Sequence, residues 1–212
     1  MKKFIQKILN EEKRGEYILE IPNLSFIPNA DLTSPKGKTN TWNELLRLLN
    51  GKPFIFDDDL DLSYTKITSL GNLQSVNGKL DLENCKNLNS LGNLKSVNGY
   101  LDLASCENLT SLGNLKSVGR SLDLKSTNIT SLGNLQSVNG YLDLYGCENL
   151  TSLGNLQSVG GSLDLRLCMD LTSLGNLRSV GGHLDLARTP ISEKYSKEEI
   201  RQMVDVKGEI YF

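Results

Sequence analysis

A Leu-Asp-Leu triplet that recurs at nearly constant spacing constrains the fold of this chain more than any other feature. The first leucines of the triplets are Leu60, Leu80, Leu101, Leu122, Leu142, Leu163 and Leu184, so the period is 20 or 21 residues. Periods of this length are typical of solenoids, in which each repeat forms one coil that stacks on its neighbours. The sequence therefore predicts a stack of about seven coils, each with a strand at its Leu-Asp-Leu triplet.

The rest of the repeat is equally regular. An apolar residue precedes each first leucine by four positions, and a Ser-Leu-Gly-Asn-Leu segment such as 111–115 follows the strand. A Cys or Thr stands five positions after the first leucine, and it explains the two period lengths. The next apolar residue is two positions after Thr, as in Thr65 and Ile67, but three after Cys, as in Cys106 and Leu109.

The segment from Leu101 to Leu109, Leu-Asp-Leu-Ala-Ser-Cys-Glu-Asn-Leu, resembles the core of the leucine-rich repeat family, and segment 112–119 resembles the turns of receptor L-domains. The resemblance covers roughly residues 56 to 186. It implies a β-rich fold, a right-handed parallel β-solenoid with extended or 3₁₀ segments on its convex side. It implies little about function, because such solenoids bind many unrelated partners.

The flanking sequence predicts short helical caps at both ends. Residues 1–53 are expected to form an N-terminal helical cap and linker, 54–191 the solenoid, and 192–212 a C-terminal cap of a helix and a strand. In the N-terminal part, residues 2–13 have the spacing of an amphipathic helix, and 34–40 are expected to form a loop. Thr41 and Glu44 have the spacing of a capping box that opens a second helix, with Trp42 in the core beneath this cap.

In the C-terminal part, Ser196 and Glu199 have the same capping-box spacing and predict a helix that extends through Met203. Residues 206–212 then repeat the spacing of apolar residues that the coils show, and this spacing predicts an eighth, terminal strand. Helices and an atypical last strand would cover the otherwise open end of a solenoid.

Composition and cysteine placement exclude several classes of protein. The net charge of −2 gives no excess of positive charge with which to bind the phosphates of nucleic acid. No apolar run approaches the roughly 20 residues that span a membrane. Four cysteines occupy one repeat position, at which Thr65, Thr127 and Thr189 stand in other coils; they are Cys85, Cys106, Cys147 and Cys168. This pattern predicts a buried ladder of small side chains and neither a zinc site nor disulfides. Free thiols in turn indicate a cytoplasmic protein.

Strand alternation places the aspartate of every triplet on the outward face, in one column along the stack. Neighbouring carboxylates about 4.8 Å apart repel by about 0.9 kcal/mol at the dielectric constant of water, a cost that the fold does not need. Three explanations stay open: neutralisation by Lys79, Lys125, Arg166 and solvent ions, docking of a basic protein, and divalent cations bridging carboxylates. We also expect Asp143→Asn and Asp164→Asn to raise stability.

The predicted function is a non-catalytic protein–protein interaction module, a monomer without cofactor or metal, whose unknown partner is a basic protein. His183 is the only histidine, and no serine or cysteine is placed to form a nucleophile pair with it. The alternatives are an acidic nucleic-acid mimic that inhibits a basic protein, and a structural assembly component. The candidate partner-binding residues are Asp81, Asp102, Asp123, Asp143, Asp164, Asp185, Tyr100, Tyr141, Tyr145 and Arg166.

Overall fold

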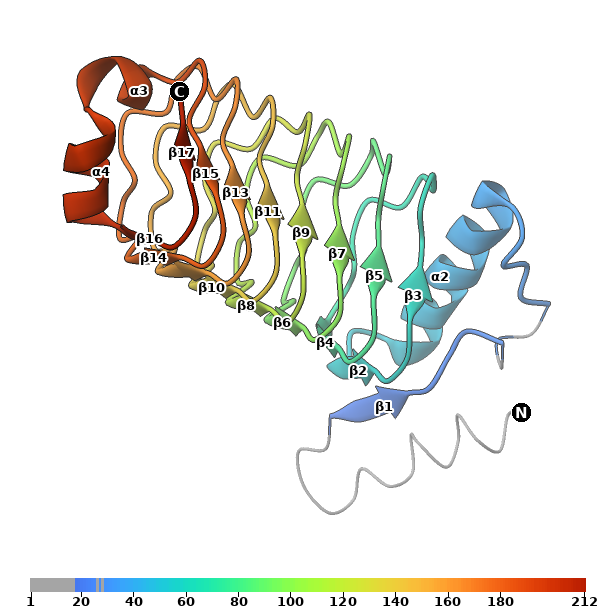
Figure 1. Ribbon diagram of the computed structural model, residues 1–212. Helices are drawn as coiled ribbons and strands as arrows, with labels where there is room; N and C mark the ends of the chain where they lie inside the picture. Colours follow the sequence, from blue (N-terminus) through green and yellow to red (C-terminus); the bar gives the residue numbers. More distant parts are fainter. Residues whose placement is uncertain (1–17, 26, 28) are drawn as a thin grey trace.

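The repeats form two parallel β-sheets that run along a single stack of coils (Figure 1). The computed structural model describes residues 18–25, Ile27 and residues 29–212. Within this part of the chain, each repeat contributes one short strand to each sheet, so the predicted parallel β-solenoid is confirmed. The sequence predicted only the strand at Leu-Asp-Leu. The second strand lies just before it, at the Ser-Val pair, and the turn between the two strands joins the sheets.

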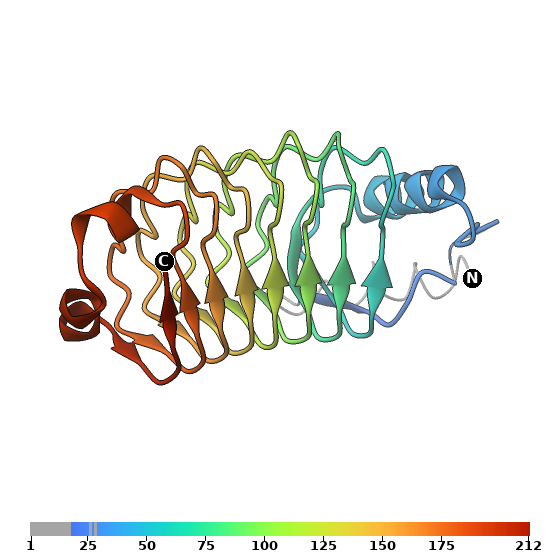
Figure 2. The ribbon, with the colours of Figure 1, turned by 45° about the horizontal axis from the view of Figure 1, so that its top comes forward.

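Sheet A has nine strands in the described residues, in the spatial order β1 (Leu19–Ile21), β2 (Phe54–Phe56), β4 (Leu73–Val76), β6 (Ser96–Val97), β8 (Ser117–Val118), β10 (Ser137–Val138), β12 (Ser158–Val159), β14 (Ser179–Val180) and β16 (Asp205–Val206). Sheet B has eight, from β3 (Leu60–Asp61) through β5 (Leu80–Asp81), β7 (Leu101–Asp102), β9 (Leu122–Asp123), β11 (Leu142–Asp143), β13 (Leu163–Asp164) and β15 (Leu184–Asp185) to β17 (Ile210–Tyr211). Figure 2 shows the strands of sheet B side by side along the stack.

Equivalent residues of successive coils pair with one another. Leu142 lies opposite Leu122 and Leu163, and Asp143 lies opposite Asp123 and Asp164. In sheet A, Val138 pairs with Val118 and Val159 in the same manner. This register keeps the leucines of every coil in the core, where they are fully buried. It also places every aspartate of the triplets in one column, as the sequence predicted.

The turn between the two strands of most coils contains glycine, because neighbouring coils approach closely there. A Cβ atom added at Gly99 would lie 2.5 Å from the carbonyl oxygen of Gly78 in the preceding coil. The same Gly99 amide donates a hydrogen bond to that oxygen at 3.0 Å. A side chain at this position requires the backbone to shift: Arg120, at the equivalent position of the next coil, makes the same bond to the Gly99 carbonyl at a longer 3.2 Å.

The predicted ladder of Cys and Thr side chains is confirmed, with all four cysteines free and buried. Each cysteine Sγ donates to a leucine carbonyl of the preceding coil at 3.0–3.2 Å, whereas each threonine Oγ1 donates to a leucine carbonyl of its own coil at 2.7–2.8 Å. The ladder therefore satisfies carbonyl groups that face the core. Asparagines of the Ser-Leu-Gly-Asn-Leu segments also connect coils: Asn93 Nδ2 donates to Asn72 Oδ1 at 2.8 Å, whereas Asn114 and Asn155 donate to glycine carbonyls at 3.1–3.2 Å.

The N-terminal end differs from the prediction in two respects. Helix α2 spans Pro35–Leu49 and its N-cap is Ser34, whose side chain accepts from the Gly37 amide. The predicted loop at 34–40 and the capping box at Thr41 are therefore wrong. Proline suits the first helical turn, where its missing N–H has no partner to lose. Thr41 instead lies within helix α2, and its side chain is buried.

The remaining N-terminal residues extend the solenoid. Strand β1 pairs with β2, so sheet A continues into the segment predicted as a linker. Trp42 of α2 is fully buried, lies 6.0 Å from the ring of Phe54 and donates from Nε1 to the Ser69 carbonyl at 3.1 Å. Its predicted place in the core beneath the cap is confirmed. The amphipathic helix predicted for residues 2–13 lies outside the described residues.

The C-terminal end contains the predicted helix and terminal strand, and one short helix that the sequence analysis did not predict. Helix α3 spans Pro190–Lys194 and α4 spans Lys197–Met203, and Ser196 and Glu199 form the predicted capping box. The chain then adds one strand to each sheet, with Val206 opposite Val180 and Ile210 opposite Leu184, so the terminal strand is confirmed. In the described part of the chain, no helix is long and apolar enough to cross a membrane.

Candidate functional site

The outward face of sheet B brings together every candidate residue that the sequence predicted. Its central column contains the triplet aspartates, with Tyr211 in the corresponding position of the last strand. One column precedes the aspartates and another follows them. The three columns together, here called the sheet B face, comprise residues 59, 61 and 63 of the first coil and the equivalent residues up to 183, 185 and 187.

The aspartates do not simply point into solvent, which corrects the prediction. Each of the seven accepts a hydrogen bond from the backbone amide two residues later, at 2.9–3.2 Å. Asp123 and Asp164 are buried, with 8% and 5% of their surface exposed. Aspartate favours this local bond to the backbone at turns. The carboxylate column therefore has a structural role that the sequence analysis missed.

The hydrogen bonds around Asp81 show why a carboxylate suits this position. In a continued parallel ladder the Glu83 amide would donate to the Leu62 carbonyl. Instead the Glu83 amide donates to Asp81 Oδ1, and the Leu62 carbonyl accepts from Cys85 Sγ. The aspartate outside and the cysteine inside thus replace one ladder bond where the strand ends and the chain turns. Buried backbone groups require such partners, since an unpaired one costs about 1–3 kcal/mol.

Four cations form ion pairs with five of the seven aspartates. Lys79 Nζ lies 2.8 Å from Asp81, Lys125 Nζ lies 2.9 Å from Asp123, and Lys38 Nζ of helix α2 lies 2.6 Å from Asp61. Arg166 contacts two coils, because it binds Asp164 through Nη2 and Nε and lies 3.6 Å from Asp185 through Nε. The predicted offset by Lys79, Lys125 and Arg166 is thereby present in the structure, and Lys38 is an addition that sequence reasoning missed.

Two aspartates, Asp102 and Asp143, form no ion pair among the described residues. Burial raises the pKa of both carboxyl groups, and the negative charges of the neighbouring aspartates raise it further. The hydrogen bond that each carboxylate accepts from a backbone amide lowers the pKa but does not outweigh these two effects. Burial alone would also raise the pKa of Asp164, but hydrogen bonds from Arg166 outweigh it and lower the pKa. In the middle of the column, the ion-paired Asp123 therefore separates the two carboxylates that have no cation.

Tyrosines lie between these charges. Tyr141 and Tyr145, with exposed fractions of 36% and 39%, flank Asp143 on one coil. Tyr141 Oη donates to Asp164 Oδ2 at 3.2 Å, and the guanidinium carbon of Arg166 lies 5.2 Å from the centre of the Tyr145 ring. On the coil of Asp102, the hydroxyl of the half-buried Tyr100 lies 3.4 Å from Asp102 Oδ2. The structure thus joins the predicted Tyr141, Tyr145 and Arg166 in one cluster.

Tyr64 is a further aromatic residue that sequence reasoning missed. Its ring is half exposed at the end of the first coil, and its hydroxyl donates to Glu83 Oε1 at 2.9 Å. It lies in the turn after the strand and adopts the left-handed backbone conformation, with φ of 59°. A strand-based alternation therefore gave no signal for its position.

A hollow of about 460 Å³ lies at the edge of the sheet B face, beside Tyr100. Its walls include Asp59, Lys79, Arg120 and the glycine turns at Gly78 and Gly99. Lys79 Nζ lies 5.6 Å from the centre of the Tyr100 ring, so the ring has a cation on one side. The edge of the face therefore combines an aromatic ring, charged groups and open space.

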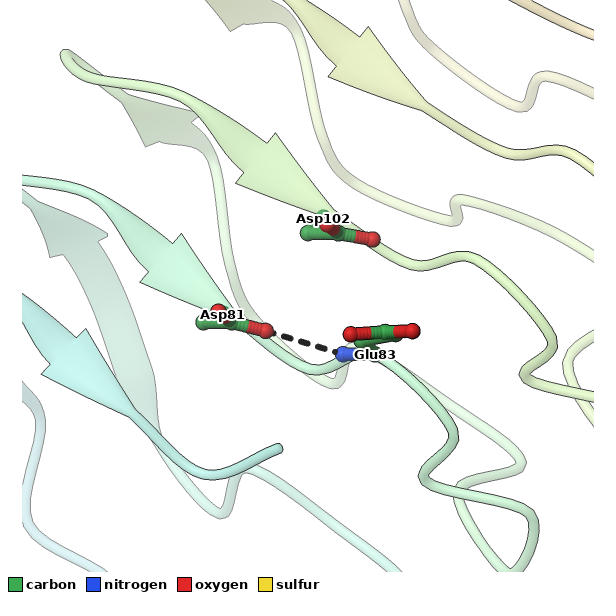
Figure 3. Close-up of side chains that lie close together, drawn as sticks. All are labelled: Asp81, Glu83 and Asp102. Atoms are coloured by element: carbon green, nitrogen blue, oxygen red, sulfur yellow. Dashed lines mark hydrogen bonds between the residues drawn. The ribbon is translucent and has the colours of Figure 1, made fainter. Parts of the chain in front are cut away.

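One group of carboxylates in the described residues has the spacing of metal ligands. Oxygen atoms of Asp81, Glu83 and Asp102 lie within 4.8 Å of one another (Figure 3). Two of the three already have partners, because Lys79 binds Asp81 and the Tyr64 hydroxyl binds Glu83. A divalent cation would compete with a fixed ammonium group here. The group is therefore best described as part of the ionic network of the face.

His183 contacts the last strand of the solenoid. Its Nδ1 accepts a hydrogen bond from the Glu209 amide at 2.9 Å, and its ring lies 5.6 Å from that of Tyr211. These contacts fasten the last strand to the preceding coil. No protein-family model, curated protein or solved structure matches the chain.

Proposed function

We propose that this chain is a leucine-rich-repeat protein that acts as a non-catalytic recognition module and binds a protein partner through the sheet B face. The observation that carries the proposal is the cluster of Tyr141, Tyr145 and Arg166, in which two exposed rings and a stacked guanidinium occupy the middle of the face. Tyrosine and arginine are the residue types that contribute most to protein interfaces. Their rings are large and lose little conformational entropy on binding.

The rigidity of the face supports this function. Backbone hydrogen bonds connect every coil to the next, as in Leu122 N to Tyr141 O at 2.9 Å and Leu142 N to Ser162 O at 3.0 Å. The aspartate bonds hold the turns, and Arg166 fixes the orientation of the Tyr145 ring. A preorganised surface binds with a smaller entropy loss than a flexible one.

The charge of the face supports a basic partner. Its seven coils carry nine carboxylates and three Lys or Arg residues, whereas the whole chain has 25 Asp and Glu against 23 Lys and Arg. The excess of carboxylates is therefore concentrated here. Such a field would steer a basic protein toward the face and repel the phosphates of nucleic acid. Cytoplasmic location and a monomeric state are parts of the same proposal.

The test compares three proteins in a pull-down from lysate of the source cell at low and high salt. The first is the wild type, the second the variant Tyr141→Ala, Asp143→Asn, Tyr145→Ala. The third, Gln136→Ala, Gln157→Ala, is a matched control that removes two exposed side chains next to sheet A strands. A partner bound by wild type and control, but lost in the triple variant and at high salt, supports the proposal. Equal retention by the triple variant contradicts it.

The two alternatives predict different outcomes in the same system. An acidic nucleic-acid mimic would be displaced from its partner by added DNA or RNA. A structural assembly component would self-associate as its concentration rises, which sedimentation velocity measures. The ion pairs that four Lys and Arg residues form with five aspartates favour protein recognition over mimicry, because a mimic of a phosphate backbone requires unpaired charges.

A further inference from the structure

Two carboxylates of the aspartate column, Asp102 and Asp143, form no ion pair among the described residues, and the sheet register defines their separation. In the register of sheet B, Asp102 lies opposite Asp123, and Asp123 lies opposite Asp143, so Asp102 and Asp143 are two coils apart. Adjacent strands lie about 4.8 Å apart, which gives a separation of roughly 9.6 Å along the stack. Between them, Lys125 binds Asp123 at 2.9 Å and leaves that coil without an unpaired carboxylate. The aspartate column therefore offers two anionic positions with a neutralised one between them. In the outer columns, Asp59 and Glu83 also form no ion pair among the described residues, but Asp59 accepts from the Lys79 amide and Glu83 accepts from the Tyr64 hydroxyl.

This separation matches one peptide conformation closely. A polyproline II helix rises about 3.1 Å per residue and has three residues per turn, so residues i and i+3 lie on one side about 9.3 Å apart. In an extended strand, residues i and i+3 point to opposite sides. In an α-helix, two residues on one side at a similar distance are i and i+7, which are about 10.5 Å apart.

Aromatic rings accompany both unpaired carboxylates. Tyr100 precedes Asp102, while Tyr141 and Tyr145 flank Asp143. The hydroxyls of Tyr100 and Tyr141 lie 3.4 and 3.2 Å from aspartate oxygens, which fixes both rings. The hollow beside Tyr100 has room for a proline ring. Aromatic surfaces bordered by polar groups are the usual binding sites for polyproline II segments.

We infer that the sheet B face binds a basic, proline-rich segment of its protein partner in the polyproline II conformation. The segment runs along the stack and places two Lys or Arg residues, three positions apart, on Asp102 and Asp143. Its prolines contact Tyr100, Tyr141 and Tyr145. This inference rests on the proposed function, since it specifies what the same face recognises.

The inference is tested with two fluorescent proline-rich peptides of identical composition, one with arginines at i and i+3 and the other at i and i+2. Binding to the full chain is measured by fluorescence anisotropy at low and high salt. We expect the i, i+3 peptide to bind at least about fivefold tighter, because only its arginines reach both carboxylates. Two partly exposed charge contacts, each contributing a factor of a few, set this estimate.

Two variants that remove the same number of charges distinguish direct contacts with Asp102 and Asp143 from attraction by the overall negative charge of the protein. Asp102→Asn, Asp143→Asn is expected to weaken binding of the i, i+3 peptide about tenfold. Asparagine keeps an oxygen that accepts the backbone amide two residues later, so the fold is retained. The control, Glu107→Gln, Glu148→Gln, removes the same charge from exposed residues two coils apart outside the three columns, and is expected to bind like the wild type.

Equal affinity for the two peptides, or equal weakening by the two variants, would overturn the inference. So would equal binding of an α-helical peptide with arginines at i and i+7. These failures differ from failure of the proposed function. A lysate partner lost in the triple variant, together with peptides that do not bind, would retain the recognition module and reject the polyproline II segment.

Discussion

Exchanging the triplet aspartates for asparagine is expected to have opposite effects on neighbouring coils. Asp164 accepts from the Arg166 amide at 3.0 Å, from Arg166 Nε at 3.0 Å and from Tyr141 Oη at 3.2 Å. Asp164→Asn keeps the shape but removes the charge, and it places an NH₂ group near the guanidinium. A hydrogen bond to a charged group contributes about 1.5–3 kcal/mol, so a loss of about 2 kcal/mol in the free energy of unfolding is expected.

Asp143→Asn is expected to stabilise the protein slightly. Its carboxylate has no cation and lies between Asp123 and Asp164, each of which is paired with its own cation. Like charges on paired strands cost about 0.2–1 kcal/mol, and the paired cations weaken that repulsion, so we expect a gain of about 0.5 kcal/mol. The prediction from sequence, that both exchanges raise stability, is thus retained for Asp143 and reversed for Asp164.

The pH dependence follows from the direction of each pKa shift. The pKa of Asp164 is lowered in the folded protein, so its stabilisation is present above the unfolded pKa of about 3.9 and disappears as the pH falls through the folded value. The deficit of Asp164→Asn should therefore shrink below about pH 4. The pKa of Asp143 is raised, so its penalty grows as the pH rises through the folded value, and the gain of Asp143→Asn should be absent in acid.

Urea denaturation of the two variants and the wild type at pH 7 and pH 3.5, followed by circular dichroism, measures these differences. Equal slopes against urea concentration would show that the midpoint shifts report stability. If Asp164→Asn and Asp143→Asn shift the midpoint equally and in the same direction at pH 7, the assignment of paired and unpaired carboxylates is wrong.

Three further predictions concern the packing of the coils. Asp102→Ala should cost about 1 kcal/mol more than Asp102→Asn in urea unfolding, because only asparagine still accepts the Ala104 amide; equal costs would refute the capping role. Burial raises the pKa of the Cys106 thiol to about 12, so at pH 8 it should react with a thiol reagent only after unfolding, and rapid native labelling would contradict its position. Gly160→Ala should lower the free energy of unfolding by about 1–3 kcal/mol, because the new Cβ atom would lie 2.2 Å from the backbone carbonyl oxygen of Asn139 in the preceding coil. An unchanged midpoint of thermal unfolding would show that the coils can move apart to accept the methyl group.

Much of the candidate site followed from the period alone. Because equivalent residues stack in a parallel solenoid, one aligned repeat places Tyr141, Asp143 and Tyr145 in their columns and assigns the cysteines to the core. The sequence also contained the signal for the start of α2, since Ser34 followed by Pro35 is typical of a helix N-terminus. Segment 34–40, predicted as a loop, instead forms the N-cap and the beginning of α2.

The ionic and hydrogen-bonding partners depended on the tertiary structure. Lys38 reaches Asp61 only because α2 packs against the first coil, and Arg166 reaches Asp185 only through the position of its side chain between coils. The hydrogen bond that each aspartate accepts from a backbone amide likewise depends on the geometry of the turn after the strand. The sequence by itself determined the architecture, because a solenoid repeats one local pattern. Only the folded chain decided that Asp61 and Asp185 also have cations, because these contacts join a helix to a coil and one coil to the next, whereas the other ion pairs join residues two positions apart in one coil.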